Sequence, residues 1–267
     1  MSNAEISPLI RVESVVAHYD SLEVLHNISF NVPSRAITVI MGVSGCGKST
    51  LLKLLIGLKK PTTGNIFIDD RNLVEMNRKE LDSFRKRIGV LFQGGALFNS
   101  MTVGENIAVP LKVHTKLSDE TIRIMTQLKL EMVGLAGFED FMPSQLSGGM
   151  RKRAGLARAL AMDPEILFFD EPSSGLDPIT SAGLDNLILK LKSAFGMTIV
   201  VVTHELESAF AIADQMIVMD KGEILAQGTP EEVKQSTNKR VIQFLHRQPE
   251  DKYSKDSQFL ETLLGRR

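Results

Sequence analysis

The sequence has few cysteines, which form the disulfides of secreted proteins, and few tryptophans and tyrosines, which lie at the interfaces of membrane proteins. It has one cysteine in 267 residues, no tryptophan and two tyrosines. A single cysteine, Cys46, cannot form an intrachain disulfide and fits a reducing compartment. No apolar run approaches the roughly 18 residues that a membrane span requires. The first ten residues carry no basic side chain, so a secretory signal is not expected.

The chain also has almost no net charge, with a formal value of −1. No global attraction to nucleic acid or to anionic lipid follows from such a balance, and nucleic acid is not an expected partner. Hydrophobic residues make up 43% of the chain, which indicates a globular protein with a sizeable core. The length permits one large domain or two small ones.

A glycine-rich segment near residue 45 is the strongest chemical signal. It matches the pattern G-x-x-x-x-G-K-[ST] and lies between an apolar run, 36–41, and a helical stretch that begins at 50. Backbone N–H groups in such a turn face a phosphate, and the following helix directs its positive end at the same point. Lys48 is expected to reach the β and γ phosphates of ATP, and the Ser49 hydroxyl to bind Mg²⁺. The predicted nucleotide contacts in this segment are Gly42, Val43, Ser44, Gly45, Cys46, Gly47, Lys48, Ser49 and Thr50.

Two adjacent carboxylates follow the apolar run 166–169. Ligands collect at the carboxyl ends of strands in open α/β sheets, so Asp170 is placed to hold Mg²⁺, directly or through water. Glu171 is then placed to polarise the water that attacks the γ phosphate. A solvated turn is the alternative interpretation of this acidic pair.

Two further polar residues end apolar runs. His204 follows the run 199–202 and is expected to contact the γ phosphate, although a structural histidine is also common at such a position. Gln93 follows the run 88–92 and is expected to contact the metal ion or the attacking water.

A second anion site is predicted about a hundred residues after the first. Ser147 and the N–H groups of Gly148 and Gly149 open a helix that is expected over 150–162. The patterning between the two sites is strand-like at 65–69 and 88–92 and helical from 102 to 162. Strand-like runs return at 165–169, 197–202 and 215–219. An α/β core with a helical insertion accounts for this order.

Together these motifs resemble the ATP-binding cassette (ABC) ATPases over residues 10–230. The resemblance implies a P-loop NTPase core with a mixed, RecA-like sheet and a helical subdomain at about 94–164. It assigns catalysis to Lys48, Glu171 and His204, and metal binding to Ser49, Gln93 and Asp170. It also implies that Tyr19 stacks on adenine, although a tyrosine there is also compatible with a core or edge position.

The family resemblance implies that two copies sandwich ATP, because the signature, 146–150, faces the γ phosphate held by the other copy. Met150 departs from the family pattern, in which glutamine stands at that position. The backbone and Ser147 donors are retained, so hydrolysis is expected to persist.

A narrower resemblance, carried by 91–98, 102–111 and 146–150, is to the ATPase subunits of bacterial Mla phospholipid transporters. It implies a peripheral position on the cytoplasmic face of the inner membrane. The implied partners are a permease, an MCE-domain lipid-binding protein and a small STAS-domain regulator, and the implied role is maintenance of outer-membrane lipid asymmetry. Two alternatives stay open: a cassette ATPase for another cargo, such as an amino acid importer, and a soluble, non-transport cassette protein.

The C-terminal stretch differs from the rest in being polar and charged. We expect an ATPase domain over 1–239 and an extension over 240–267. Phe259, Leu260, Leu263 and Leu264 have helical spacing, which suggests a segment that docks on a second copy or on a regulator. A frayed tail is the alternative.

Overall fold

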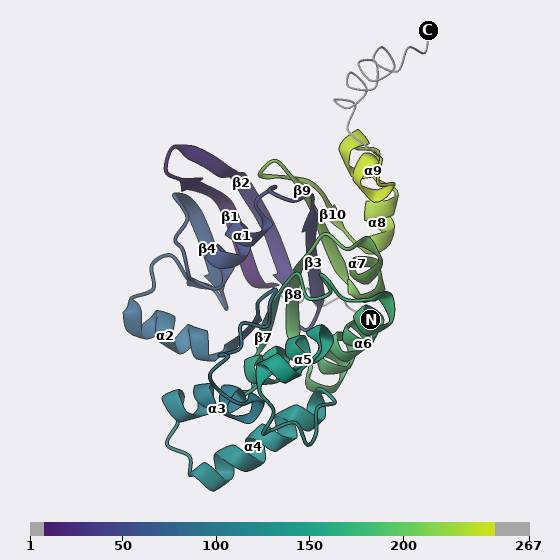
Figure 1. Cartoon of the computed structure of the whole chain (residues 1–267). Coiled ribbons are helices and arrows are strands. Elements are labelled where there is room, and N and C mark those ends of the chain that lie inside the picture. Colours follow the sequence, from purple (N-terminus) through teal and green to yellow (C-terminus); the bar gives the residue numbers. More distant parts are fainter. Residues whose placement is uncertain (1–7, 249–267) are drawn as a thin grey trace, which may run out of the picture.

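The structure, a computed structural model, describes residues 8–248. They form two β-sheets and the helices that pack around them (Figure 1). The strands are β1 Pro8–Tyr19, β2 Leu22–Pro33, β3 Ile37–Gly42, β4 Thr63–Ile68, β5 Arg71–Asn72, β6 Ile88–Leu91, β7 Ile166–Asp170, β8 Thr198–Thr203, β9 Gln215–Asp220 and β10 Glu223–Gly228. The helices are α1 Lys48–Leu55, α2 Arg78–Lys86, α3 Val103–His114, α4 Asp119–Met132, the 3-10 turn η1 Pro143–Gln145, α5 Gly148–Ala159, α6 Pro178–Phe195, α7 Leu206–Ile212, α8 Pro230–Lys234 and α9 Lys239–Leu245.

The larger sheet has six strands in the order β10-β9-β3-β8-β7-β6. All adjacent strands run parallel except β10, which is antiparallel to β9. Every residue of β3 and β8 is buried, as expected for central parallel strands that are covered on both faces. The carboxyl ends of β3, β7 and β8 therefore meet at one edge, which brings Gly42, Asp170 and Thr203 together.

The smaller sheet is antiparallel in the order β2-β1-β4-β5. Its inner side chains, α1 and one face of the larger sheet share a single hydrophobic cluster, to which Ile10, Leu51 and Phe168 belong. The opposite face of the larger sheet, including Val39 and Phe169, packs in a second cluster with α3 to α7. Helix α1 and the glycine-rich loop before it are thus held between the two sheets.

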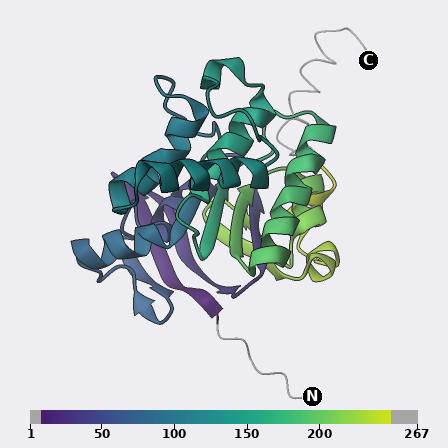
Figure 2. The same ribbon diagram turned by 90° about the horizontal axis from the view of Figure 1, so that it is seen from below.

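Helices α3, α4 and α5 form the lobe at the end opposite α9 (Figure 1), and the view from below shows them over the strands (Figure 2). Side chains of Thr102, Ser118 and Ser147 cap their N-termini. Asn106, fully buried, accepts from Phe98 N at 2.7 Å, and its Nδ2 donates to three carbonyls of residues 98–102. This asparagine fixes the loop that enters the lobe, whose helices lie within the 94–164 segment predicted for them.

The beginning of the predicted extension is part of the folded body. Helix α9 buries Val241 completely, and Phe244 and Leu245 pack against the main core cluster. The apolar residues Phe259, Leu260, Leu263 and Leu264 lie outside the described residues. Within residues 8–248, no helix combines the length and the apolar character needed to cross a bilayer.

Candidate functional site

The glycine-rich loop joins β3 to α1 in a conformation that its glycines permit. Gly45 and Gly47 have φ values of 81° and 106°, which side chains rarely adopt. A Cβ added to Gly42 would lie 2.1 Å from the carbonyl oxygen of Met219 on β9. The loop therefore needs glycine for its turn and for its close approach to the neighbouring strand.

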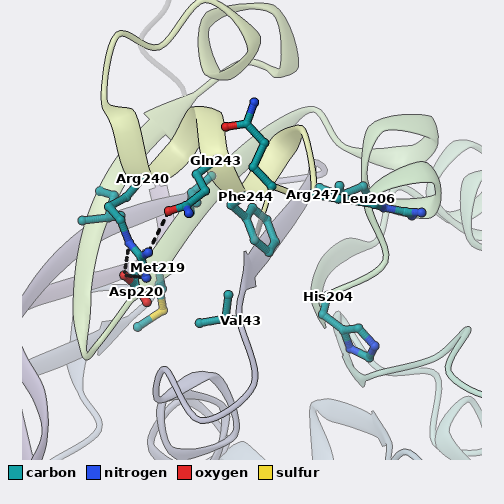
Figure 3. A pocket seen from close by; sticks show the side chains of 12 residues that line it. Val43, His204, Leu206, Met219, Asp220, Arg240, Gln243, Phe244 and Arg247 are labelled. Carbon is teal, nitrogen blue, oxygen red and sulfur yellow. Dashed lines mark hydrogen bonds and ion pairs between the residues drawn. The ribbon is translucent and has the colours of Figure 1, made fainter. Parts of the chain in front are cut away.

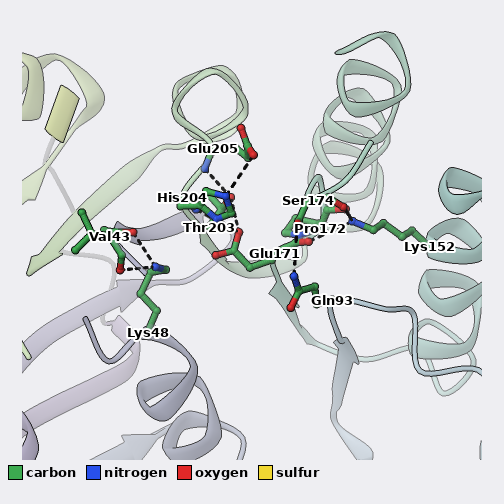
Figure 4. A network of polar contacts seen from close by, with 11 residues as sticks. Val43, Lys48, Gln93, Lys152, Glu171, Pro172, Ser174, Thr203, His204 and Glu205 are labelled. Atoms are coloured by element: carbon green, nitrogen blue, oxygen red, sulfur yellow. Dashed lines mark hydrogen bonds and ion pairs between the residues drawn. The ribbon is translucent and has the colours of Figure 1, made fainter. Parts of the chain in front are cut away.

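Lys48 is the first residue of α1 and is 6% exposed. Its Nζ donates to the carbonyl oxygens of Gly42 at 2.7 Å and Val43 at 3.1 Å, so the ammonium lies across the loop (Figure 4). Ser49 and Thr50 follow in the first turn, where helix N–H groups have no intrahelical acceptor. This is the arrangement expected of a phosphate-binding loop.

One open pocket of about 310 Å³ collects most of the predicted residues. It is lined by Val24, Ser44, Gly45, Gly47, Lys48, Ser49, Thr50, Gln93, Glu171 and His204. Segments far apart in the sequence thus meet at the carboxyl edge of the larger sheet. Val24, on β2, was not predicted, since an apolar strand residue carries no motif.

Asp170 ends β7, and its Oδ1 is buried without a hydrogen-bond partner among residues 8–248. Burial raises the pKa of this carboxyl, and the charge of Glu171 raises it further, while Lys53 and Lys48 act in the opposite direction. A buried, unpartnered carboxylate oxygen beside a phosphate loop suits a cation, because Mg²⁺ takes one or two carboxylates plus phosphate oxygens. The donor set therefore fits the predicted metal.

Glu171 has a left-handed backbone with φ of 50°, uncommon for a residue with a side chain. Its N–H donates to the Val202 carbonyl at 2.8 Å. Its Oε2 accepts from Thr203 Oγ1 at 3.2 Å and lies 2.8 Å from His204 Nδ1 (Figure 4). The side chain is 13% exposed and faces the pocket lined by the phosphate loop, where a water near phosphate would be polarised.

His204 sits directly after β8 with a side chain 42% exposed. Its Nδ1 faces Glu171 and its Nε2 lies 3.5 Å from Glu205 Oε1. Gln93 reaches the site from the other side, where its Nε2 donates to Ser174 Oγ at 3.4 Å. Both side chains line the pocket at the phosphate loop, and their predicted contacts with the γ phosphate and the metal ion stay predictions.

Tyr19, by contrast, ends β1 at the surface with 41% of its area exposed. The Lys59 ammonium lies 3.3 Å from the centre of its ring, a cation–π contact. Tyr19 is not among the residues that line the pocket. Its predicted contact with adenine stays a prediction.

The signature residues lie elsewhere in the chain. Ser147 caps α5, with its Oγ accepting from Met150 N at 3.2 Å. Gly149 packs so tightly on α6 that an added Cβ would lie 2.5 Å from Thr180 Cγ2. Neither residue lines the pocket formed by the phosphate loop of the same chain, which is the arrangement that a site shared between two copies requires.

Met150 has a packing role. Its side chain is partly buried and packs against the main core cluster. The backbone N–H of the same residue takes part in the helix cap through Ser147. A thioether in this apolar contact explains how the site accommodates methionine where the family pattern has glutamine.

A second pocket, of about 270 Å³, adjoins the site on the side of α9 (Figure 3). Val43 and His204 line it on one side, and Phe244 of α9 and Arg247, which follows that helix, line it on another. Arg240 anchors α9 to the sheet through an ion pair with Asp220 at 2.9 Å. Helix α9 therefore lines the same pocket as Val43 of the phosphate loop and His204.

Comparison with known proteins agrees with this geometry. Residues 25–174 match the family described as ABC transporter. The chain is 42% identical over 237 residues to the intermembrane phospholipid transport system ATP-binding protein MlaF of Haemophilus influenzae, covering 89% of this chain and 90% of that protein. It is 46% identical over 222 residues to MlaF of Escherichia coli, covering 83% and 82%. It is also 42% identical over 237 residues to the probable ribonucleotide transport ATP-binding protein mkl of Mycobacterium tuberculosis, covering 89% of this chain and 66% of that protein.

Solved structures give the same result. A dimeric, post-hydrolysis ATP-binding cassette with ADP and Pi matches with a TM-score of 0.77 and 33% identity, covering 82% of this chain and 98% of that one. The cbiO1 protein of Clostridium perfringens, described as part of an ABC transporter complex, matches with a TM-score of 0.79 and 31% identity, covering 90% and 95%. The predicted fold and the predicted resemblance to the Mla ATPases are confirmed. This chain belongs to the ABC transporter family, as one of its ATP-binding, ATP-hydrolysing subunits.

Proposed function

We propose that this protein energises phospholipid transport between the inner and outer membranes of a bacterium and so maintains outer-membrane lipid asymmetry. The observation that carries the proposal is the 42% and 46% identity to two MlaF proteins over most of both chains. The site supports the motor part of this role, because the side chains needed for hydrolysis converge on one pocket. The cargo rests on the identity to MlaF.

Within one copy, the hydrolytic roles follow from position. Lys48 and the loop N–H groups bind the β and γ phosphates of ATP. Glu171 accepts a proton from the attacking water, and His204, 2.8 Å from it, orients the carboxylate and contacts the γ phosphate. Ser49, Gln93 and Asp170 would hold Mg²⁺, which supplies neutralisation of the charge that develops on the phosphate oxygens.

A second copy completes the site in this proposal. Ser147 and the N–H groups of Gly148 and Gly149 begin α5, a 12-residue helix whose N-terminal end suits an anion. These groups do not line the pocket of their own chain, which supports a site formed across a homodimer. The dimeric relative with ADP and Pi gives the same indication.

We further propose the partners that the MlaF likeness suggests: an integral permease, an MCE-domain protein and a small STAS-domain regulator. The ATPase would then sit on the cytoplasmic face of the inner membrane. We propose that the segment 93–103 receives the permease; in it, Leu97 packs against the core while Phe98 is 50% exposed. Phe98 is therefore the side chain of this segment that we expect to contact the permease.

The experiment is a gene replacement in the native host. Deletion should raise phospholipid in the outer leaflet of the outer membrane, and the parent gene should reverse the change. A Glu171→Gln gene, expressed to the same level, should fail to reverse it. Unchanged outer-leaflet lipid after deletion would overturn the proposed cargo.

Another cargo is favoured by one specific observation, the 42% identity to a protein named for ribonucleotide transport. The same strains distinguish it. Loss of uptake of a soluble compound, with unchanged membrane lipid, would assign the motor to that cargo. Recovery of a permease with an MCE protein, when the tagged chain is purified from detergent-solubilised membranes, would support lipid.

The role of the C-terminal segment needs a carefully placed truncation. A chain cut after Arg240 would lose Val241, which is fully buried, and would disturb the core as well as any interchain contact. A chain cut after Gln248 leaves α9 intact. We propose that the latter truncation weakens the dimer or regulator binding, and unchanged assembly would refute this role.

A further inference from the structure

Lys152 is a buried lysine on α5, two residues after the signature. It is 6% exposed, and its ammonium has three hydrogen-bond partners (Figure 4). Nζ donates to the carbonyl oxygens of Pro172 at 2.6 Å, Ser174 at 2.5 Å and Glu171 at 3.3 Å. An ammonium has three donors, so its capacity is filled by backbone groups. No carboxylate forms an ion pair with it among residues 8–248.

All three acceptors belong to one short segment that begins at the proposed base. Glu171 occupies the sparsely populated left-handed region, with φ of 50°, so its backbone must be held by its surroundings. Its N–H is held by the Val202 carbonyl of β8 at 2.8 Å. Its C=O is held by Lys152. The peptide groups on both sides of the base are therefore fixed by different elements.

Other basic residues of α5 hold different segments. Arg153 donates to the Val133 carbonyl at 2.9 Å inside the helical lobe. Arg158 donates to the carbonyls of Gly95 at 3.1 Å and Ala96 at 2.8 Å, after Gln93. Among Lys152, Arg153 and Arg158, only Lys152 therefore contacts the segment of the proposed base. Arg153 is a matched control on the same helix.

From this geometry we propose that Lys152 is a positioning residue that sets the orientation of Glu171 and joins it mechanically to the signature helix. The inference rests on the proposed role of Glu171 as base. When α5 shifts, the segment from Glu171 to Ser174 shifts with it, and the Glu171 carboxylate moves relative to His204. The side chain of Gln93 contacts the same segment, because its Nε2 donates to Ser174 Oγ.

Burial disfavours the charged form of Lys152, so the hydrogen bonds of its ammonium offset an unfavourable desolvation. Burial lowers the pKa of Lys152, and the charge of Glu171 acts in the opposite direction. A buried lysine that served packing alone would be replaced without loss by a side chain of similar length and no charge. Here such a replacement would leave three carbonyls of the catalytic segment without their donor.

The test measures steady-state ATP hydrolysis by the full-length chain, alone and in its membrane complex. Lys152→Met should lower kcat about tenfold to a hundredfold with KM for ATP within about threefold, since small misplacements of catalytic groups act on turnover. Lys152→Arg, which keeps donors, should recover most of that loss. Arg153→Met should keep kcat within about twofold, because its contact is remote from the base. Urea unfolding of each variant separates turnover from stability.

Where Lys152→Met does not fold, Lys152→Gln, which keeps two N–H donors, takes its place, and its kcat should fall about threefold to tenfold. A second measurement uses the Glu171→Gln background. If Lys152 acts through Glu171, adding Lys152→Met there should cost no more than about a further twofold. Parental kcat in folded Lys152→Met or Lys152→Gln, or losses that simply multiply in the double variant, would overturn the inference. Parental turnover of Glu171→Gln alone would instead overturn the proposed base.

Discussion

Nδ1 of His204 lies 2.8 Å from Oε2 of Glu171, and the same oxygen accepts from Thr203 Oγ1 at 3.2 Å. Residues at the end of β8 therefore hold one oxygen of the Glu171 carboxylate. The carboxylate is fixed in direction at the pocket that the phosphate loop lines. A general base fixed in this way loses little entropy when it meets the attacking water.

Glu171→Gln keeps the size of this side chain and removes its ability to accept a proton. We expect turnover to fall about 10²- to 10⁴-fold while ATP still binds, because general base catalysis contributes this much. ATP-bound dimers should accumulate, detected by size-exclusion chromatography beside phosphate release. Glu205→Gln, on the other side of His204, is the control and should keep near-parental turnover. Parental phosphate release by Glu171→Gln would contradict the assignment.

Gly149→Ala should lower the free energy of unfolding by about 1–3 kcal/mol, because its Cβ would press on Thr180 Cγ2. Adding Thr180→Ser removes that methyl group and should restore most of the stability, measured by urea unfolding without nucleotide. Gly148→Ala is the control, since its Cβ would lie 3.9 Å from Leu176 Cδ2, an ordinary contact. Failure of Thr180→Ser to restore stability would show that the glycine serves another purpose.

Met150→Gln tests the packing role of the methionine. The amide would replace a thioether against the main core cluster, and we expect a loss of about 1 kcal/mol in unfolding free energy. The rate of ATP hydrolysis should stay within about threefold of the parent, because the Ser147 cap and the helix N–H groups are unchanged. A gain in stability would contradict the packing explanation.

Asp185 predicts a pH dependence of stability. It is 7% exposed on α6, its Oδ1 accepts from Ser208 Oγ on α7 at 2.5 Å, and burial raises its pKa above the ordinary 3.8, against the opposing hydrogen bond. The folded state then binds this proton more tightly than the unfolded state. The stabilisation is complete below the unfolded pKa and is lost as pH rises through the folded one.

Asp185→Asn cannot ionise, so its stability relative to the parent should increase as pH rises from about 4 to about 7. Urea unfolding of both proteins across this range measures the difference. Asp214→Asn, at an exposed ion pair with Lys192, is the comparison for loss of a surface carboxylate. Parallel stability curves for Asp185→Asn and the parent would show that Asp185 does not cause this dependence.

Much of the site could be predicted because its residues end apolar strands. The carboxyl ends of parallel strands share one edge, so Gly42, Asp170 and His204 had to be near one another once the runs before them were identified as strands. Local backbone geometry also sets part of the phosphate-loop pattern, because the glycine before the lysine, Gly47, has a φ of 106°.

Tertiary packing decides what the sequence left open. Nothing around Lys152 distinguishes it from its basic neighbours, since its acceptors lie about twenty residues away and are backbone carbonyls. The inward turn of Met150 and the burial of Val241 likewise depend on elements distant in sequence. The position of Val24 at the pocket depends on how the smaller sheet lies beside α1.

Asp170 and Glu171 are consecutive residues, and the chemistry proposed for each depends on a single step along the chain. Asp170 is the last residue of β7 and pairs with Val202 of β8, while Glu171 leaves the strand. A slip of one residue between these two strands would place Glu171 where the metal ligand belongs and carry Asp170 into the strand interior. The pairing of β7 with β8 therefore determines which of the two acids ends the strand and which lies in the turn after it.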